Sequence, residues 1–582
     1  MAASPTLQPH RRRRAGLLAL VGIALLALAP VHPAGAQTTH SWDAFEQVTG
    51  ANGREYIADS QGRALQLRGV NIKTGDPADG ARDEVLDAIA ARGFNLLRLS
   101  VFWEQVEPEQ GEYDQAYLDD IDAVITSAEQ RGIWVVVSFH QDTFGSAFGG
   151  HGIPPWATKD DGLPFEDTGS FLTNYLQPGV QAAWENLYED PDIRAAQAAT
   201  WTHVAAEYSD HPNVIGYDLL NEPFGKIREG EDLFTAAKRV ESVQLTAMYQ
   251  RLTDAIRTVD EQGWMFIEAP NLASLGIATS LGRVNDERVV FFPHMYNTDI
   301  ELEIYNGSGD PSGYNPAFFE NWANAITTYT DSYKVPMMVG EWGVPTPYPG
   351  IDRYIAQVLE TMEATTSGWA QFNGCFGEGY CTFGPDGEDR VQIDQIVQPY
   401  AQAIAGLPDN HHYDPATRTL RITYADGDAT GATEIAVPAT KLYPKGWRLD
   451  VDGTKVEPST EQPAPGVDLI SVEVPNNGTT HTLCLTPTEA PQSCATAPVD
   501  AGSPPPVGPS SPNDPPSSGN NASPTLHPAR TNRHPVRLPS PFRPGSPAES
   551  TRPEARPVGN RLPPARRHGL TSGALGGRSS VG

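Results

Sequence analysis

The stretch VIGYDLLNEPFG (residues 214–225) decides how this chain can fold. It opens as an apolar, strand-like run that ends in Asn-Glu-Pro, so Glu222 lies where a buried strand meets a loop. A second stretch of the same form, VPMMVGEWG (residues 335–343), places Glu341 at its end. Either residue alone could be an ordinary solvated loop glutamate. As a pair, they offer the two carboxylates that hydrolysis of a glycosidic bond requires.

Eight apolar segments of this kind recur between residues 45 and 406. They read LQLRGVN, FNLLRLS, IWVVVSFH, VIGYDLL, WMFIEAP, VVFFPHMY, VPMMVGE and GWAQF. Amphipathic stretches lie between them, such as residues 117–132, whose apolar residues share one helical face. Apolar strands that alternate with helices indicate a parallel sheet buried on both faces. We therefore predict an α/β fold, a (β/α)₈ TIM barrel, as the catalytic domain over residues 37–406.

The pattern changes after this domain. Residues 407–496 contain short segments in which apolar and polar residues alternate, with turn residues between them, which predicts a small antiparallel β-sandwich. Residues 497–582 are rich in Pro, Ser, Gly and Arg and almost lack aromatic residues, so we expect a disordered tail. The long connection at 141–191 is rich in aromatic residues, which predicts a small satellite core that also shapes a substrate cleft.

The N-terminus has the form of an export signal. Four arginines precede the apolar run AGLLALVGIALLALA and a small-residue site at residues 34–36, which predicts a signal peptide over residues 1–36 and a secreted protein. The apolar run is short for a membrane anchor. The net charge of −31 argues against binding to nucleic acid or to anionic membranes. We expect a monomer.

Four cysteines in an exported chain favour disulfides. Their spacing predicts the pairs Cys375–Cys381 and Cys484–Cys494. A zinc site is the alternative, but neither a CxxC spacing nor an adjacent histidine supports it. We therefore predict no metal and no cofactor.

Polar side chains gather at the ends of the predicted strands, where the chemistry of a (β/α)₈ barrel takes place. They are Arg98, His140, Asn221, Glu222, His294, Tyr296 and Glu341, with Phe372 at the end of the last strand. Each of them alone could be an internal ion-pair partner or a satisfied rim residue. Together they favour a retaining glycosidase, in which Arg98 and Tyr296 keep one carboxylate ionised and Asn221 donates to a sugar 2-hydroxyl.

The order RGVN, NLLRL, His, NEP, PHMY and GEWG resembles glycoside hydrolase family 5 over nearly all of residues 45–406. The resemblance implies that Glu222 is the acid/base and Glu341 the nucleophile. It also implies active-site roles for the positions that match the rest of the family pattern, namely Arg98, His140, Asn221, His294 and Tyr296.

Further motifs resemble bacterial endoglycoceramidases, which release the intact glycan from glycosphingolipids by cutting the bond between sugar and ceramide. These motifs are YDLLNEPFG, HQD, PPWATKDDGLP, LQPGV and AMYQRLTDAIRTVD. The resemblance implies a glycolipid or oligosaccharide substrate. Asp142 of HQD and Lys73, which follows the first strand, are further candidate sugar-binding residues.

The chain departs from the family pattern at Phe372 and Phe171, where tryptophans are expected, and at Ser138, where Asp is common. These departures leave open whether a glucosyl or a galactosyl linkage is cleaved. Two other functions stay possible: a family 5 glucanase or mannanase, and a non-catalytic protein that binds glycans or lipids. The paired carboxylates speak against the second, because binding alone needs no acid and nucleophile.

Overall fold

The computed structural model describes residues 45–73, 82–270, 272–297, 300, 314–345 and 350–489. The predicted signal peptide, the predicted tail and Cys494 lie outside these residues. In the part of the chain that is described, no helix combines the length and apolar character that a membrane span needs.

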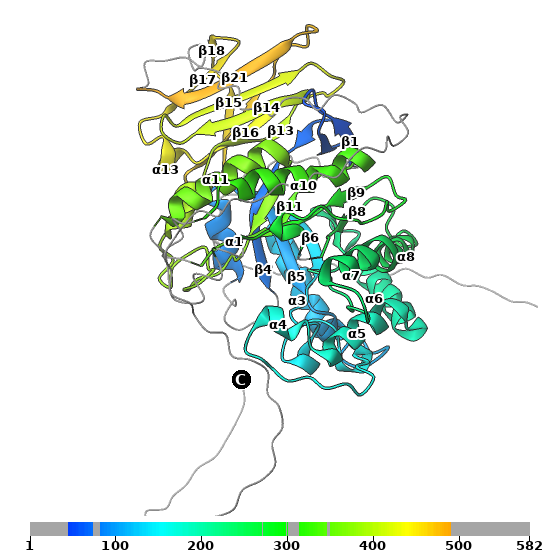
Figure 1. The fold of residues 1–582 in the computed structure, drawn as a ribbon. Helices are drawn as coiled ribbons and strands as arrows, with labels where there is room; N and C mark the ends of the chain where they lie inside the picture. The colour runs from blue at the N-terminus through cyan, green and yellow to red at the C-terminus, as the bar shows by residue number, and fades with distance from the viewer. Residues whose placement is uncertain are drawn as a thin grey trace, which may run out of the picture. The chain divides into compact units, whose positions relative to one another are not determined.

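A parallel sheet forms the centre of the catalytic domain (Figure 1). Its order is β10-β11-β12-β4-β5-β6-β7-β8-β9. The strands are β4 (Leu67–Lys73), β5 (Leu96–Val101), β6 (Trp134–Phe139), β7 (Val214–Asp218), β8 (Trp264–Ile267), β9 (Val289–Phe291), β10 (His294–Met295), β11 (Val339–Trp342) and β12 (Gly368–Gln371). They coincide with the eight predicted segments, because β9 and β10 are two parts of VVFFPHMY.

The sheet closes into a barrel between β9 and β11. A parallel bridge joins Phe291 to Met337, and the N–H of Met338 donates to the carbonyl of Phe291 at 3.1 Å. Beyond the break at Pro293, β10 pairs with β11 again, and the N–H of Gly340 donates to the Pro293 carbonyl at 3.0 Å. The predicted TIM-like barrel is thus confirmed.

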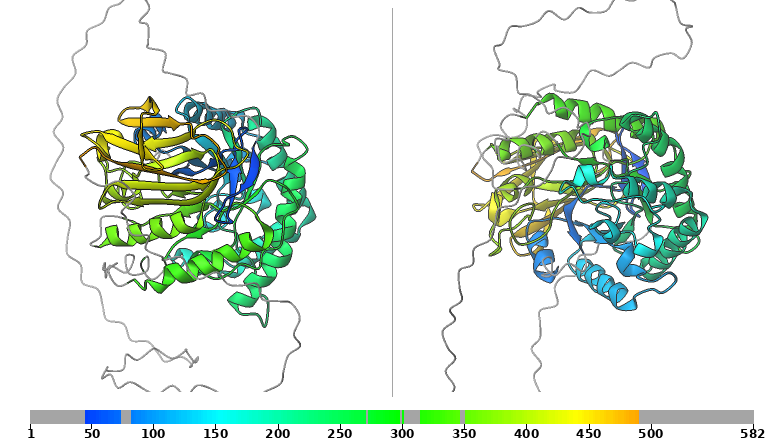
Figure 2. Two further views of the ribbon diagram at one scale, coloured as in Figure 1. Left: turned by 90° about the horizontal axis from the view of Figure 1, so that it is seen from above. Right: turned by 60° about the horizontal axis from the view of Figure 1, so that its bottom comes forward.

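Helices surround these strands (Figure 2). They are α1 (Arg82–Ala90), α2 (Trp103–Val106), α3 (Gln115–Glu129), α6 (Pro191–Tyr208), α7 (Leu233–Arg239), the π-helical η4 (Val240–Leu245), α8 (Thr246–Ile256), η5 (Ala273–Leu275), α10 (Ala317–Tyr333), α11 (Ile351–Thr365) and α12 (Val391–Ile396). Helix α3 shows how sequence fixes such an element. The Asp114 carboxylate accepts the N–H groups of Ala116 and Tyr117, and the predicted apolar face is buried.

Side chains fill the inside of the barrel. Trp134, Val136, Ile215, Trp264 and Phe266 belong to one buried cluster contributed by successive strands. Neighbouring strands approach very closely at β7, since a Cβ on Gly216 would lie 2.0 Å from the Trp264 carbonyl oxygen. The interior is therefore a packed core, and chemistry is confined to the strand ends.

The long connection after β6 contains η2 (Ser146–Phe148), η3 (Pro155–Ala157), α4 (Phe171–Asn174) and α5 (Pro178–Glu189). Its aromatic residues pack on one another: the rings of Phe144 and Trp184 lie 5.2 Å apart, and Tyr175 and Tyr188 are buried beside them. This cluster is the predicted satellite core. The side chain of Phe171 lies outside the described part.

The C-terminal region consists of two antiparallel sheets. One has the order β14 (Leu407–Asp414), β15 (Thr419–Ala425), β21 (Thr480–Pro487), β17 (Trp447–Val451) and β18 (Thr454–Val456). The other has the order β1 (Glu46–Thr49), β2 (Glu55–Ala58), β3 (Ala64–Leu65), β13 (Tyr400–Ile404), β16 (Thr433–Val437), β20 (Val467–Val472) and β19 (Ser459–Ala464), and α13 (Ala439–Leu442) follows β16.

This second sheet takes strands from both sides of the barrel sequence. Residues 46–65 supply β1 to β3, and β3 pairs with β13, with Leu65 opposite Ala403. Residues 46–65 and β13 both fall inside the range 37–406 that the sequence assigns to the barrel domain. The N-terminal strands therefore attach the sandwich to the barrel.

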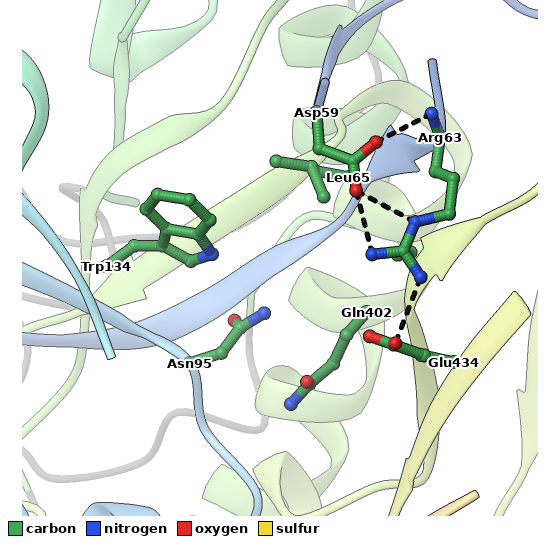
Figure 3. A pocket seen from close by; sticks show the side chains of 8 residues that line it. Asp59, Arg63, Leu65, Asn95, Trp134, Gln402 and Glu434 are labelled. Carbon is green, nitrogen blue, oxygen red and sulfur yellow. Dashed lines mark hydrogen bonds and ion pairs between the residues drawn. The ribbon is translucent and has the colours of Figure 1, made fainter. Parts of the chain in front are cut away.

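Buried ion pairs also lie where the sandwich meets the N-terminal end of the barrel strands (Figure 3). Arg63 contacts Asp59 at 2.8 Å and Glu434 at 3.0 Å, beside a small pocket that Trp134 also lines. Nearby, Glu363 of α11 contacts His411 of β14 at 2.8 Å. The contact between Glu363 and His411 connects the two domains, whereas the ion pairs of Arg63 join parts of the seven-stranded sheet of the sandwich.

The connection after β12 carries the disulfide between Cys375 and Cys381, which confirms the first predicted pair. The second predicted pair stays a prediction, because Cys484 belongs to β21 but Cys494 lies outside the described residues.

Candidate active site

Arg98 lies at the centre of the predicted site. It belongs to β5 and is fully buried. Its guanidinium donates to Asp218 at 2.7 Å, to Glu268 at 2.8 Å and to Glu341 at 3.0 Å, and also to the amide oxygens of Asn71 and Asn221, each at 2.8 Å. Burial opposes the charged form, but Asp218, Glu268 and Glu341 outweigh it and raise the pKa of Arg98.

Glu341, at the end of β11, is held from both sides. One carboxylate oxygen accepts from Arg98, and the other accepts the hydroxyl of Tyr296 at 2.8 Å. Burial alone would raise the pKa of Glu341, yet the nearby His294 and Arg98 lower it below its ordinary value. Glu341 is therefore an ionised, oriented carboxylate.

Glu222 follows β7 in an unusual backbone conformation. Its φ is +43°, in the left-handed region that non-glycine residues seldom adopt. The Gln141 side chain donates to the carbonyls of Asn221 and Glu222, at 3.1 and 3.0 Å, and the N–H of Glu222 donates to Glu268 at 2.8 Å. These contacts hold the turn that directs the Glu222 side chain.

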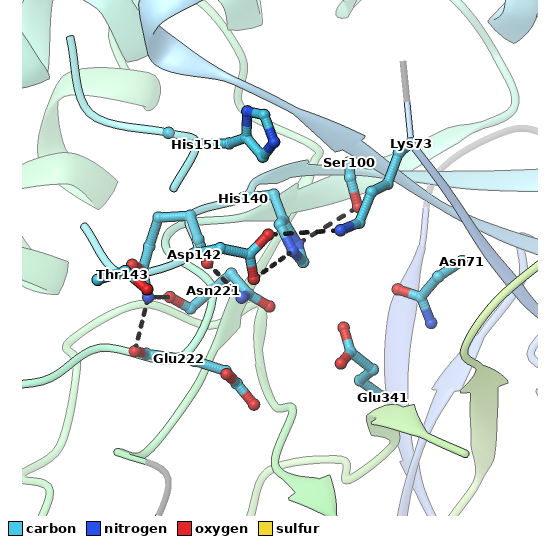
Figure 4. A network of polar contacts seen from close by, with 12 residues as sticks. Asn71, Lys73, Ser100, His140, Asp142, Thr143, His151, Asn221, Glu222 and Glu341 are labelled. Carbon is cyan, nitrogen blue, oxygen red and sulfur yellow. Dashed lines mark hydrogen bonds and ion pairs between the residues drawn. The ribbon is translucent and has the colours of Figure 1, made fainter. Parts of the chain in front are cut away.

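The two predicted catalytic carboxylates face each other (Figure 4). One oxygen of Glu222, one oxygen of Glu341 and one ring nitrogen of His294 all lie within 4.8 Å of one another. Three such donors can hold a cation. However, Arg98 and Tyr296 already donate to the two oxygens of Glu341, so the protein itself supplies the positive charge that this carboxylate needs.

His294 connects the Glu222 carboxylate with Glu268. The parallel register places it beside Glu341. Its Nδ1 atom lies 3.0 Å from a Glu222 oxygen, and its Nε2 atom makes an ion-pair contact of 3.2 Å with Glu268 that lacks the alignment of a good hydrogen bond. Burial opposes protonation, but Glu268 and Glu341 raise the pKa of His294 well above its ordinary value.

The remaining predicted residues form a second group at the same end of the barrel (Figure 4). Asp142 lies 3.4 Å from Lys73 and 3.7 Å from His140. Interactions with His140 and Lys73 outweigh burial and lower the pKa of Asp142. Lys73 also lies 5.3 Å from the ring centre of Phe372. The candidate residues that the sequence identified therefore lie at one site.

Asp218, Glu268, Asn71 and Gln141 also belong to this site, although the sequence analysis did not single them out. Glu268 follows the apolar run WMFI and obeys the same strand-end rule that identified Glu222. Asp218 is the last residue of β7, and the hydroxyl of Ser138 donates to it at 2.7 Å. An aspartate within the apolar run VIGYDLL was the feature of the sequence that could have identified it.

Comparison with known families agrees with this geometry. Residues 58–375 match the family described as cellulase, glycosyl hydrolase family 5. Residues 398–484 match the glycoside hydrolase family 5 C-terminal domain. The first match includes every residue of the site described above.

Two curated relatives cover most of the chain. Endoglycoceramidase I from Rhodococcus hoagii is 28% identical over 467 residues, which is 77% of this chain and 90% of the relative. An endoglycoceramidase from Hydra vulgaris is 24% identical, covering 73% of this chain and 87% of its own. A solved structure of endo-glycoceramidase II from Rhodococcus sp. with ganglioside GM3 is 28% identical, with a TM-score of 0.65, and the match covers 75% of this chain and 99% of that one. The chain belongs to glycoside hydrolase family 5 and is a glycoside hydrolase.

Proposed function

We propose that this enzyme is a retaining β-glycosidase that releases the glycan of glycosphingolipids by cutting the bond between sugar and ceramide. The separation of the catalytic pair carries the mechanistic part of the proposal. Retaining enzymes place their two carboxyl groups about 5–5.5 Å apart, whereas inverting enzymes need roughly 6.5–9.5 Å to admit a water. One oxygen of Glu222 lies within 4.8 Å of one oxygen of Glu341, and this short separation favours retention.

The environment of Glu341 supports the proposed division of roles. Glu341, kept ionised by Arg98, attacks the anomeric carbon and forms a glycosyl ester. Glu222 protonates the departing ceramide oxygen in the same step. Glu222, now a carboxylate, then takes a proton from water as that water attacks the ester, which frees the glycan and restores both groups.

The substrate class rests on the named relatives. Both curated relatives described above are endoglycoceramidases, and they match over 87–90% of their own length. The second group at the site, made of Lys73, His140 and Asp142, offers charged donors and acceptors suited to sugar hydroxyls. We also propose that the protein is exported, because residues 1–36 have the form of a signal peptide.

A substrate panel tests this proposal. The purified enzyme is incubated with a ganglioside linked through glucose, a glycolipid linked through galactose, a soluble β-glucan and a mannan, and products are identified by mass spectrometry. We expect intact oligosaccharide and free ceramide from at least one glycolipid, and little product from the polysaccharides. Hydrolysis of the polysaccharides alone would instead identify a glucanase or mannanase.

The stereochemistry provides an independent test. Proton NMR during the first minutes of reaction is expected to show the β-anomer of the released sugar before mutarotation. Initial release of the α-anomer would exclude the double displacement.

A further inference from the structure

Glu268 lies directly after β8 and is 1% exposed. It takes no part in the two chemical steps above. It nevertheless contacts Arg98, which holds the nucleophile, and the groups that surround the acid/base. One carboxylate oxygen accepts from Arg98 at 2.8 Å and lies 3.2 Å from His294 Nε2. The other oxygen accepts the N–H of Glu222 at 2.8 Å.

We propose that Glu268 is a positioning residue that fixes the proton and the orientation of His294, and through His294 controls proton transfer by Glu222. The inference rests on the proposed function, since it requires Glu222 to be the acid/base. It assigns Glu268 no contact with substrate.

The first argument concerns the two nitrogens of His294. A carboxylate can only accept, so the Nε2 atom that faces Glu268 carries a proton. The Nδ1 atom, 3.0 Å from Glu222, then has two available states. It accepts a hydrogen bond from a neutral Glu222, or it carries a proton and donates a hydrogen bond to an ionised Glu222. One proton is thus shared between Glu222 and His294, which suits a residue that must give a proton up and take one back. The Nε2 contact is poorly aligned, as is common for catalytic contacts before substrate binds.

The second argument concerns the backbone. Glu222 holds a φ of +43°, and such a conformation persists only when its surroundings over-determine it. Glu268 accepts the N–H of Glu222 from one side, while Gln141 donates to its carbonyl from the other. The same carboxylate therefore positions both the main chain of Glu222 and the imidazole that faces its side chain.

The charges around Glu268 agree with this role. The titratable groups that face it come from β5, β7, the turn after β7, α8 and β10. They are Arg98, Asp218, Glu222, Tyr249 and His294, and Glu341 is a further partner of Arg98 and His294. Burial and the charge of Glu268 raise the pKa of Asp218 to about 7, so Glu268 imposes its charge on this cluster.

The variant Glu268→Gln separates positioning from a merely structural role. The Gln amide can donate to Nε2 and favour the opposite tautomer, in which Nδ1–H keeps Glu222 ionised. Acid catalysis then suffers, while attack by Glu341 does not. We expect kcat/KM to fall about 10²-fold for a β-glycoside with an alcohol leaving group, the usual lower range for general acid catalysis. With a 2,4-dinitrophenyl leaving group, which needs no proton, kcat/KM should fall no more than about threefold, since that step draws nothing from the acid.

Glu107→Gln is the matched control. Glu107 is 2% exposed and accepts hydrogen bonds from Trp103, Thr200 and the N–H of Gly111, but none of its hydrogen bonds involves the catalytic groups. Its replacement should leave the ratio of kcat/KM between the two leaving groups at the wild-type value.

The pH profile gives a second readout. Loss of the Glu268 charge lowers the pKa of His294, so the alkaline limb of kcat/KM for the alcohol glycoside should move to lower pH. Glu268→Asp keeps the charge, and its alkaline limb should remain near that of wild type even though the shorter side chain reduces the rate.

A measurement on the unaltered enzyme covers the case in which neither variant folds. ¹⁵N NMR of histidine-labelled protein, with His294 assigned through His294→Gln, should show a proton on Nε2. A neutral His294 with its proton on Nδ1 would overturn the proposal. Equal losses with both leaving groups, or none, in folded Glu268→Gln would also overturn it. In contrast, a Glu341→Gln enzyme with wild-type activity would refute the proposed function itself.

Discussion

The two ends of the barrel both bury charged residues, but they use them differently. At the N-terminal end, Arg63 is paired with Asp59 and Glu434 where the barrel meets the sandwich. At the C-terminal end, Arg98 contacts Asp218, Glu268 and Glu341 together.

The difference between the ends lies in convergence and strain. At the C-terminal end, four carboxylates meet around Arg98 and His294, and one of them, that of Glu222, belongs to a residue with a left-handed backbone. Within the described residues, one oxygen of Asp218 is buried with no hydrogen-bond partner. Buried charge alone therefore does not mark an active site. Several carboxylates that converge beside a strained turn do.

The largest difference between the ends should appear on removal of a carboxylate. We expect Glu341→Gln to lower kcat on the order of 10⁴-fold or more, because it removes a nucleophile that acts as one unit with its partners. Glu434→Gln, at the opposite end, should leave kcat within about twofold, since surface and structural positions affect stability rather than chemistry. Steady-state kinetics on the best glycolipid checks both. A comparable loss of kcat in both variants would show that the two ends do not differ in their role in catalysis.

Removal of the central cation at each end should affect stability at both ends and activity at only one. Arg98→Met leaves buried carboxylates without their partner, which typically costs about 3–5 kcal/mol of unfolding free energy. We expect a folded fraction with greatly reduced kcat/KM. Arg63→Met should also be destabilised, yet its folded fraction should keep wild-type kcat/KM. Denaturant unfolding followed by kinetics on the native protein measures both quantities, and loss of activity in folded Arg63→Met would contradict the assignment.

The junction with the sandwich should be acid-sensitive. Although burial opposes it, hydrogen bonds from His411 and His412 lower the pKa of Glu363 from 4.5 to about 2. A depressed pKa stabilises the folded state above pH 4.5, and this contribution is lost as pH falls from 4.5 towards 2. Its size is about 3 kcal/mol.

Glu363→Gln tests this contribution. Chemical unfolding at a series of pH values should show lower stability than wild type at neutral pH, and a shallower decline between pH 4.5 and 2. Parallel curves for the two proteins would show that the ionised Glu363 does not support the junction.

The smallest effect is expected at the rim of the site. Phe372→Ala removes the ring that lies 5.3 Å from Lys73, without touching the catalytic pair. An aromatic contact of about 0.5–1.5 kcal/mol predicts a KM roughly twofold to thirteenfold higher with little change in kcat. A change confined to kcat, measured on the same glycolipid, would place Phe372 in the chemistry rather than in binding.

Sequence patterns predicted what is local and repetitive. The eight strands followed from apolar runs, and the strand-end rule identified Glu222 and Glu341. Glu268 obeys the same rule, but a single glutamate before Ala-Pro has many ordinary explanations until its contacts with Arg98 and His294 are known. Asp218 could not be placed, because its role depends on which side chain faces it across the barrel.

The attachment of the sandwich could not be predicted for a related reason. The pairing of Leu65 with Ala403 joins segments that are far apart in the sequence. Short strands such as β3 carry too few residues to reveal a distant partner. Their position is fixed by tertiary packing, in which Ile57 and Leu65 cover the barrel core at the N-terminal end of its strands.

In the proposed mechanism, Glu341 forms a covalent bond to the sugar, and Glu222 transfers the proton as acid and base. A 2-deoxy-2-fluoro-β-glycoside with a good leaving group slows breakdown of the glycosyl ester and allows it to accumulate. Intact-mass and peptide mass spectrometry of the inactivated enzyme should then show one fluorosugar, attached to the peptide that contains Glu341. A label on Glu222 or on another residue, or turnover without any trapped intermediate, would contradict the account.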